Sequence, residues 1–400
     1  IKNSSSQNNV SCFSFPFITL YNIIMNKNTK PLKYIFENHF HQTWNNIKHK
    51  FPKNLHSSIW NNVSKFLDCG DISRGYTAFK CNQCSHMHIV GFSCKSRFCS
   101  SCGKIYAENW ALNLKEQLFD VQHIHAVFSL PTGFCRDFFF SHRFKLQDLA
   151  KAAYQSLKYV FKKSGIHSFG AIVNIHTFSR NLDWNPHIHC IFTYGGYKKN
   201  DQWKELKSIP YPALKKSWQK CSLDIIANFA KINNNINLKN KISLCYRKYN
   251  DGFYVKSDKK INNIFEIAKY IGRYLARPAI AEYRITDITD SSVTFWYQKP
   301  DSPKKIFLTL PMTQFIGRLL AHIPPKNFKM IRRFGLYSRR YKNKKPKKIK
   351  LFKGKISWAE RIFKTFKTNP LICPKCNSNL VLLEIFHIKY GVIFPKTGFS

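Results

Sequence analysis

Two histidines separated by a single residue are the first candidates for chemistry. His187 and His189 lie in the segment NPHIHCIFTYGG, whose apolar residues predict a β-strand. Residues two apart on a strand project from the same face, so Ile188, Cys190 and Phe192 would face the core on the other side. Two imidazoles on one face can bind a divalent metal ion, or they can be satisfied by ordinary hydrogen bonds.

Two tyrosines one helical turn apart are the second candidates. The segment 261–277 has the periodicity of an amphipathic helix, with Tyr270 and Tyr274 on one face at the edge of its apolar stripe. Arg273 and Arg277 lie beyond them. Because a free phenol has a pKa of about 10, a nucleophilic role near neutral pH requires a metal ion or these arginines to stabilise the phenolate. Tyrosines at such a boundary are also common packing residues.

Paired cysteines predict a zinc site. Cys81-x-x-Cys84 and Cys99-x-x-Cys102 are separated by fourteen residues, a spacing typical of four thiolates that converge on one Zn²⁺. Nearby residues of ligand type leave open a second metal ion or an exchanged ligand; they are Cys69, Cys94, His86 and His88.

A further cysteine pair, Cys373-x-x-Cys376, stands alone near the end of the sequence. Its only candidate partner is His387, and it is interpreted as half of a degenerate site or as a turn.

The charge balance favours a polyanionic partner. The 65 Lys and Arg residues face 21 Asp and Glu residues, for a formal net charge of +44. Nucleic acid is the expected partner, although AT-rich coding also enriches lysine. The segment 338–350 carries eight Lys or Arg in thirteen residues and would contact phosphates without reading sequence. The cations chosen as candidates for phosphate or DNA binding are Arg273, Arg277, Arg339, Arg340, Lys344 and Lys345. No apolar stretch is long enough to predict a membrane span.

The elements that must position these residues follow from hydrophobic periodicity. Helices are predicted over 31–68, up to about 120, and over 144–163. Strands are predicted at 125–130, 171–178 and 187–194, the last two joined by a polar turn as an antiparallel hairpin. Residues 232–242 are predicted to form a solvated loop that precedes a strand pair at 243–256.

The order of these motifs resembles a known family. HAVFSLPTGF, NPHIHCIFTYGG and KYIGRYLARPAIAEYRI follow the paired cysteines. This order is similar to that of the two-tyrosine rolling-circle transposases of bacterial insertion sequence family ninety-one, which are HUH endonucleases. The resemblance covers residues 31 to about 340. It implies an α+β chain in which a helical, zinc-ribbon-like module precedes a nuclease domain with a central antiparallel sheet flanked by helices.

The resemblance also suggests a division of the chain. The expected parts are a leader 1–30 that is not necessarily native coding sequence, a zinc-binding DNA-contact domain 31–120, a catalytic domain 121–335 and a basic C-terminal segment 336–400.

Carried over residue by residue, the resemblance assigns His187 and His189 to a catalytic Mg²⁺ or Mn²⁺, and Tyr270 and Tyr274 to nucleophilic attack. Four residues are candidates for a third metal ligand: His125, His176, Asp183 and Glu282.

The implied activity is cleavage and rejoining of single-stranded DNA through a 5′-phosphotyrosine, in a cytoplasmic, nucleoid-associated bacterial protein. Two alternatives remain: a replication initiator or relaxase with the same chemistry, and a zinc-dependent DNA-binding protein without activity. The sequence has no GxxxxGK[ST] phosphate loop of the kind a fused helicase would carry.

Overall fold

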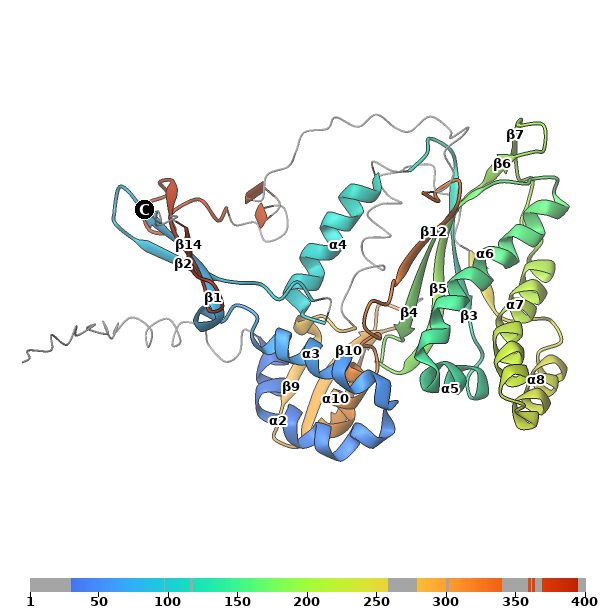
Figure 1. Ribbon diagram of the computed structural model, residues 1–400, viewed down its shortest axis with the longest axis horizontal. Helices are drawn as coiled ribbons and strands as arrows, with labels where there is room; N and C mark the ends of the chain where they lie inside the picture. The colour runs from blue at the N-terminus through green and yellow to red at the C-terminus, as the bar shows by residue number, and fades with distance from the viewer. Residues whose placement is uncertain are drawn as a thin grey trace, which may run out of the picture.

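The computed structural model describes residues 30–96, 98–115, 118–257, 279–299, 302–339, 359–360, 362–363 and 369–394. Within these ranges the protein is α+β, as expected, and its sheets are antiparallel throughout. Figure 1 shows a helix-covered sheet at one end of the molecule, a helical body in the middle and a narrow four-stranded sheet at the other end.

The central sheet has five strands in the order β12-β4-β5-β3-β8. Their bounds are β3 (His123–Ser129), β4 (Gly170–Phe178), β5 (Trp184–Thr193), β8 (Val255–Ser257) and β12 (Ile331–Gly335). β4 and β5 pair as an antiparallel hairpin, which confirms that prediction. The two strands with the longest apolar runs therefore lie at or beside the centre of the sheet, where both faces are covered.

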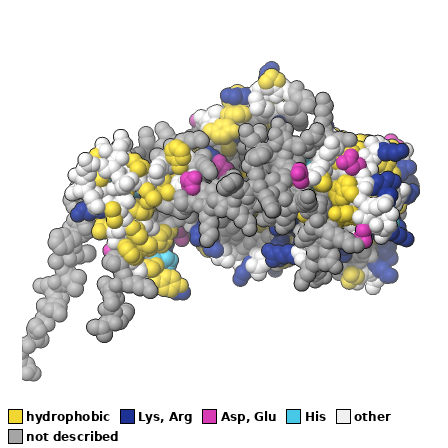
Figure 2. Space-filling view, turned by 90° about the horizontal axis from the view of Figure 1, so that it is seen from above, with side chains coloured by type: hydrophobic (Ala, Val, Ile, Leu, Met, Phe, Trp, Pro, Cys, Tyr) yellow, Lys and Arg dark blue, Asp and Glu magenta, His cyan; other side chains and the backbone are white. Residues whose placement is uncertain are grey.

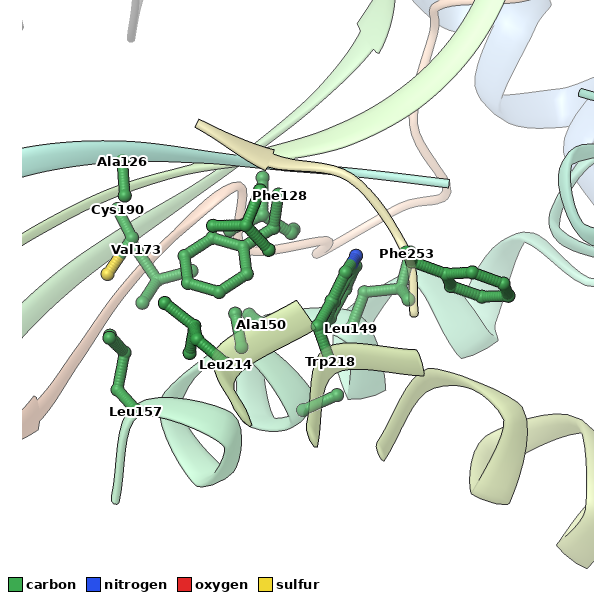
Figure 3. Packing of buried hydrophobic residues seen from close by; sticks show 14 of the residues in the cluster. Ala126, Phe128, Leu149, Ala150, Leu157, Val173, Cys190, Leu214, Trp218 and Phe253 are labelled. Atoms are coloured by element: carbon green, nitrogen blue, oxygen red, sulfur yellow. The ribbon is translucent and has the colours of Figure 1, made fainter. Parts of the chain in front are cut away.

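Helices bury one face of this sheet. They are α5 (Phe134–Ser141), α6 (Leu146–Lys163), α7 (Tyr211–Ile232) and α8 (Ile236–Lys248). Alternate strand residues, among them Phe128, Val173 and Cys190, pack against Leu149 and Trp218 of these helices (Figure 3). The predicted helix over 144–163 is confirmed as α6.

The prediction of a loop at 232–242 and a strand pair at 243–256 is wrong. Most of this region is helix α8, and only β8 of the expected strands forms. Asn235 caps the helix by accepting a hydrogen bond from the Leu238 amide at 3.0 Å. Ile242 and Cys245 are buried in the core of the central sheet, so tertiary packing stabilises a segment whose Asn and Lys content suggested a loop.

A second core joins the N-terminal helices to a segment that follows far later in the sequence. α2 (Pro31–Ile47) and α3 (His56–Leu67) bear out the predicted helical start. Their buried side chains pack in one core with side chains of β9 (Ile285–Ile288), β10 (Ser292–Gln298), β11 (Lys305–Pro311) and α10 (Met312–Leu320). The domain boundaries proposed at residues 120 and 335 stay a prediction.

The narrow sheet, called the ribbon below, combines both ends of the described chain. Its order is β14-β13-β1-β2, from β1 (Gly75–Cys81), β2 (Met87–Gly91), β13 (Leu380–His387) and β14 (Gly391–Phe394). In Figure 1 the late strands lie beside the early ones at the end of the molecule away from the central sheet.

The remaining elements are connections and short hairpins. α4 (Ser100–Lys115) leads from the ribbon towards the central sheet, and β6 (Gly195–Tyr197) pairs with β7 (Trp203–Glu205). The 3₁₀ turns are η2 (Lys48–Lys50), η3 (Lys53–Leu55), η4 (Ile72–Arg74), η5 (Arg143–Lys145) and η6 (Glu282–Arg284). None of the helices in the described ranges has the length and apolar character needed to cross a bilayer.

Candidate functional site

Three histidines meet on the face of the central sheet opposite α6 and α7. His187 and His189 of β5 lie beside His176 of β4, and one ring nitrogen from each lies within 4.8 Å of the others. We call these three residues the histidine cluster. As expected from strand alternation, Ile188, Cys190 and Phe192 of the same strand are buried in the core on the other face.

Hydrogen bonds fix which nitrogen of each β5 histidine can bind a metal ion. His187 Nδ1 lies 2.7 Å from the Asn185 carbonyl oxygen, so Nδ1 carries the proton and donates it. His189 Nδ1 lies 2.9 Å from His125 Nε2, and donation from His189 to that nitrogen leaves His189 Nε2 with a lone pair. The two Nε2 atoms are 3.1 Å apart. Two ligands at right angles, each about 2.1 Å from an ion, are about 3.0 Å apart, so this spacing suits neighbouring positions of an octahedron.

Burial keeps the imidazoles of His187 and His189 neutral. Removal from water lowers the pKa of His187 to about 4. The same cause, with repulsion from the neighbouring His176, holds the pKa of His189 well below its usual value. Neutral imidazoles are the form that binds metal, so His187 and His189 can bind an ion at neutral pH.

Of the four candidates for a third ligand, the structure brings His176 to the cluster. His125 contacts the Nδ1 atom of His189, whereas the Nε2 atom of His189 is the one near His187. His125 therefore suits a role in orienting the His189 ring rather than in binding the metal ion. Asp183 forms an ion pair with Arg318 at 2.6 Å. Glu282 accepts a hydrogen bond from Ser100 Oγ at 2.5 Å, and its burial raises the pKa of the carboxyl group.

Helix α10 and the residues just after it contact the turn between β4 and β5, the two strands that carry the histidine cluster. His322 donates through Nε2 to the Leu182 carbonyl at 3.0 Å and accepts through Nδ1 from the Thr177 hydroxyl at 3.2 Å. Arg318 donates to the Asn181 carbonyl at 2.9 Å. The body formed with the N-terminal helices thus helps to position the site.

Two polar residues beside the cluster were missed in the sequence analysis. Asn174 pairs with His189 across β4 and β5, is fully buried, and has no hydrogen-bond partner for either side-chain polar atom among the described residues. The exposed Lys256 of β8 pairs with Val127, which itself pairs with His189. Residues paired across antiparallel strands share a face, so only the register could reveal that these side chains lie on the histidine face.

The two tyrosines and their arginines lie outside the described residues. Tyr270, Arg273, Tyr274 and Arg277 all fall in 258–278, so their position relative to the histidine cluster stays a prediction. The segment follows β8 directly, and β8 is separated from β5 only by β3. Two strand spacings are about 10 Å, and about 13 residues from Ser257 to Tyr270 can span that distance even as a helix, at about 1.5 Å per residue.

Four thiols gather at the base of the ribbon, where it joins α3 and α4. This base cluster consists of Cys69, Cys94, Cys99 and Cys102. The Sγ atom of Cys69 lies 3.7 Å from that of Cys102 and 3.8 Å from that of Cys99, and the Cys94 and Cys102 sulfurs are 3.6 Å apart. Sulfurs placed tetrahedrally about 2.3 Å from Zn²⁺ are about 3.8 Å apart, so the spacing matches a four-thiolate zinc site.

The prediction that Cys81, Cys84, Cys99 and Cys102 share one ion is wrong. Cys81 and Cys84 lie at the tip of the ribbon with Cys373 and Cys376, and we call these four residues the tip cluster. The seven residues of β1 separate tip from base by about 20 Å. The fourteen-residue gap therefore contains β2, the return strand of a hairpin, which carries the two cysteine pairs to opposite ends of the ribbon.

Basic side chains are distributed over the surface. Figure 2 shows Lys and Arg gathered at the end of the molecule formed by α7, α8 and the β6–β7 hairpin. Exposed cations on those two helices are Lys216, Lys220, Lys231, Lys239, Lys241, Arg247 and Lys248. Of the predicted phosphate contacts in the basic segment, Arg339 is described and exposed, while Arg340, Lys344 and Lys345 lie outside the described residues.

Comparisons with known proteins match both the cysteine-rich part of the chain and the part that carries the histidine cluster. Residues 36–130 match a family model described as a transposase zinc-binding domain, and residues 170–345 match one described as a putative transposase. The chain is 30% identical over 291 residues to the transposase for insertion sequence element IS801 of Pseudomonas savastanoi pv. phaseolicola, covering 70% of each chain. It is 25% identical over 299 residues to the putative transposase y4qJ of Sinorhizobium fredii (strain NBRC 101917 / NGR234), covering 69% of this chain and 74% of the relative. No solved structure matches.

Proposed function

The chain belongs to the IS91 family of two-tyrosine transposases with a zinc-binding domain, and from this premise we propose that it cuts and rejoins single-stranded DNA through a 5′-phosphotyrosine intermediate. The observation that carries the proposal is the histidine cluster. Three imidazoles converge on one sheet face, and each β5 histidine has a hydrogen-bond partner at its Nδ1 atom that orients its ring. Such a preorganised set suits a metal ion that acts on a phosphate.

We assign the metal ligands to His176, His187 and His189. A divalent ion held there would polarise the scissile phosphate and offset the charge that builds up on its oxygens. Imidazole ligands suit Mn²⁺ better than Mg²⁺, which prefers oxygen and keeps its water. Mn²⁺ should therefore support cleavage at lower concentration than Mg²⁺.

The reaction needs no external energy source, because each P–O bond that breaks is replaced by another P–O bond. The phenolate oxygen of Tyr270 attacks the phosphorus, a P–O bond to the protein forms, and the P–O3′ bond breaks. The leaving 3′ oxygen takes up a proton, and the 5′ phosphate stays on the tyrosine. Attack by a 3′ hydroxyl on this phosphotyrosine reverses the step and seals the strand. Tyr274 would hold a second 5′ end, which allows two strands to be exchanged.

Single-stranded DNA is the substrate that this chemistry favours, because in-line attack needs an accessible backbone phosphate. Lys256 lies on the same sheet face as the cluster and can contact a neighbouring phosphate. The large cationic excess supplies the remaining, sequence-independent attraction.

The test is formation of a covalent adduct. Purified protein with Mn²⁺ and a labelled single-stranded oligonucleotide from the ends of the element should give a product that resists denaturing gel electrophoresis. Tyr270→Phe with Tyr274→Phe should abolish this product, because phenylalanine cannot form the phosphodiester. The exposed Tyr283→Phe is the matched control and should leave it unchanged.

Three other outcomes of the adduct experiment would contradict the proposal. A full yield of adduct from the double tyrosine variant would exclude these nucleophiles. An adduct that never transfers to a second strand would favour an initiator or relaxase. Retained DNA binding with no adduct under any metal condition would favour a binding protein without activity.

A further inference from the structure

We propose that a second zinc ion fastens the C-terminal hairpin to the N-terminal one. Its ligands are the thiols of the tip cluster: Cys81, Cys84, Cys373 and Cys376. The matched zinc-binding family model ends at residue 130, so two of these four ligands lie far beyond it. The inference is independent of the cleavage chemistry proposed above.

The sulfur positions fit one tetrahedral ion. Cys81 Sγ lies 3.4 Å from Cys376 Sγ, and Cys84 Sγ lies 3.6 Å from Cys373 Sγ. All four sulfurs lie within 4.8 Å of one another. These spacings are far longer than the S–S bond of about 2.05 Å in a disulfide and close to the separation of about 3.8 Å around Zn²⁺.

The two cysteine pairs also have the same backbone conformation. The amide of the first cysteine donates to a carbonyl five residues later in both: Cys81 to His86 at 2.9 Å and Cys373 to Ser378 at 2.7 Å.

The residue after the second cysteine has a positive φ in each turn, 52° at Ser85 and 59° at Asn377. A non-glycine residue rarely adopts this conformation, so its occurrence at equivalent positions indicates two turns shaped for the same task. The two Cys-x-x-Cys turns therefore have equivalent backbone geometry, and their sulfur atoms meet at the tip cluster.

The buried apolar cluster of the ribbon is small. It consists of Phe79, Leu380 and the two ligand cysteines Cys81 and Cys373. β1 and β13 pair along seven positions with one bulge, and the Tyr76 hydroxyl donates to Glu384 at 2.6 Å. Modules this small usually need a metal ion or disulfides for stability, and the cysteines of this module are free.

The consequence concerns the basic segment 338–350. Tyr337, directly before it, is buried against the central sheet, and Cys373 is buried in the tip cluster. The described residues on both sides of the basic segment are therefore held in the fold, and zinc at the tip cluster would fix the C-terminal side.

The first test is zinc content. The test uses full-length protein that carries His187→Ala, because the histidine cluster could otherwise bind a further zinc ion. This protein should contain two zinc ions per chain by metal analysis. Adding Cys373→Ser and Cys376→Ser should lower this to one, whereas adding Cys221→Ser, which alters a cysteine outside both clusters, should leave two. Two zinc ions in the double-serine variant, or one in its parent, would overturn the inference.

The second test keeps all native cysteines. A protease site inserted after Lys350 is cleaved in the folded protein, and the fragments are separated by size exclusion. With zinc bound, the C-terminal fragment should co-elute with the rest, and removal of zinc by a chelator should release it. Separation with zinc still bound would disprove the fastening, as would co-elution from zinc-free protein.

Discussion

His125 controls the site without belonging to the histidine cluster. Its Nε2 lies 2.9 Å from His189 Nδ1, and acceptance of the Nδ1 proton there leaves the lone pair of the His189 ring on Nε2, 3.1 Å from His187 Nε2. Partners of this kind are worth 10- to 100-fold in metal affinity. The geometry of the site thus depends on a residue that orients a ligand and does not itself join the histidine cluster.

A substitution at His125 tests this role. His125→Ala should weaken Mn²⁺ binding roughly 10- to 100-fold, measured by calorimetry. His125→Gln retains an acceptor for the His189 proton and should recover part of the affinity. The exposed His49→Ala should have no effect. Equal affinities for the alanine variant and the native protein would rule out the orienting role.

His123 links folding stability to pH. It is fully buried, its Nε2 lies 2.6 Å from the Tyr337 hydroxyl, and burial lowers its pKa to about 4. In the unfolded chain a histidine titrates near 6.5. Between about pH 6.5 and 4 the unfolded state therefore binds the additional proton, so this contribution to stability is complete above that window and is lost as the pH falls through it.

Denaturant unfolding at several pH values measures the effect. His123→Gln should show a shallower decline of the free energy of unfolding between pH 6.5 and 5 than the native protein, while His49→Gln should follow the native curve. Comparison of the two variants removes the contribution of the zinc thiolates, which respond to acid in both. Identical slopes for His123→Gln and the native protein would contradict the assignment.

At the scale of elements, α8 shows how a local cap and a few buried side chains override composition. Asn235 supplies the cap, and Asn235→Ala should lower the free energy of unfolding by about 1 kcal/mol. The exposed Asn240→Ala, inside the same helix, should be neutral or slightly stabilising because alanine has the higher helix propensity. Urea unfolding of both variants decides the point, and equal destabilisation would argue against a specific cap.

The β1–β2 hairpin explains why spacing alone misassigned the zinc ligands. Cys69 precedes β1 and Cys94 follows β2, both at the base, whereas Cys81 ends β1 and Cys84 lies in the turn that follows, at the tip. Two CxxC pairs in sequence order look like one site unless the strands between them are recognised. The surplus cysteines noted in the sequence are thus the missing halves of two clusters.

At the scale of the whole molecule, the distribution of charge predicts how salt acts on DNA binding. Changing Arg339, Arg340, Lys344 and Lys345 to glutamine should weaken single-stranded DNA binding and flatten the dependence of log K on log salt concentration by up to about 3, from about 0.7 for each phosphate contact. Fluorescence anisotropy across a salt series measures both quantities.

A matched control places the same charge change elsewhere. Lys239, Lys241, Arg247 and Lys248 lie on α8, on the side of the central sheet opposite the histidine cluster. Their replacement by glutamine should change the salt dependence much less. An equal effect from both sets would mean that the basic segment has no special role in binding DNA.

The sequence by itself determined the residues that face each side of β5 and the order of the main strands along the chain, because strand alternation and helical periodicity are local properties. The α+β class came from the resemblance to the transposase family. The sequence also identified the cysteines and histidines with ligand chemistry. Only the tertiary structure decided which of them meet. His176 joins the histidine cluster through strand register, and Cys373 joins Cys81 through pairing of β1 with β13, contacts between residues far apart in the chain that no local spacing encodes.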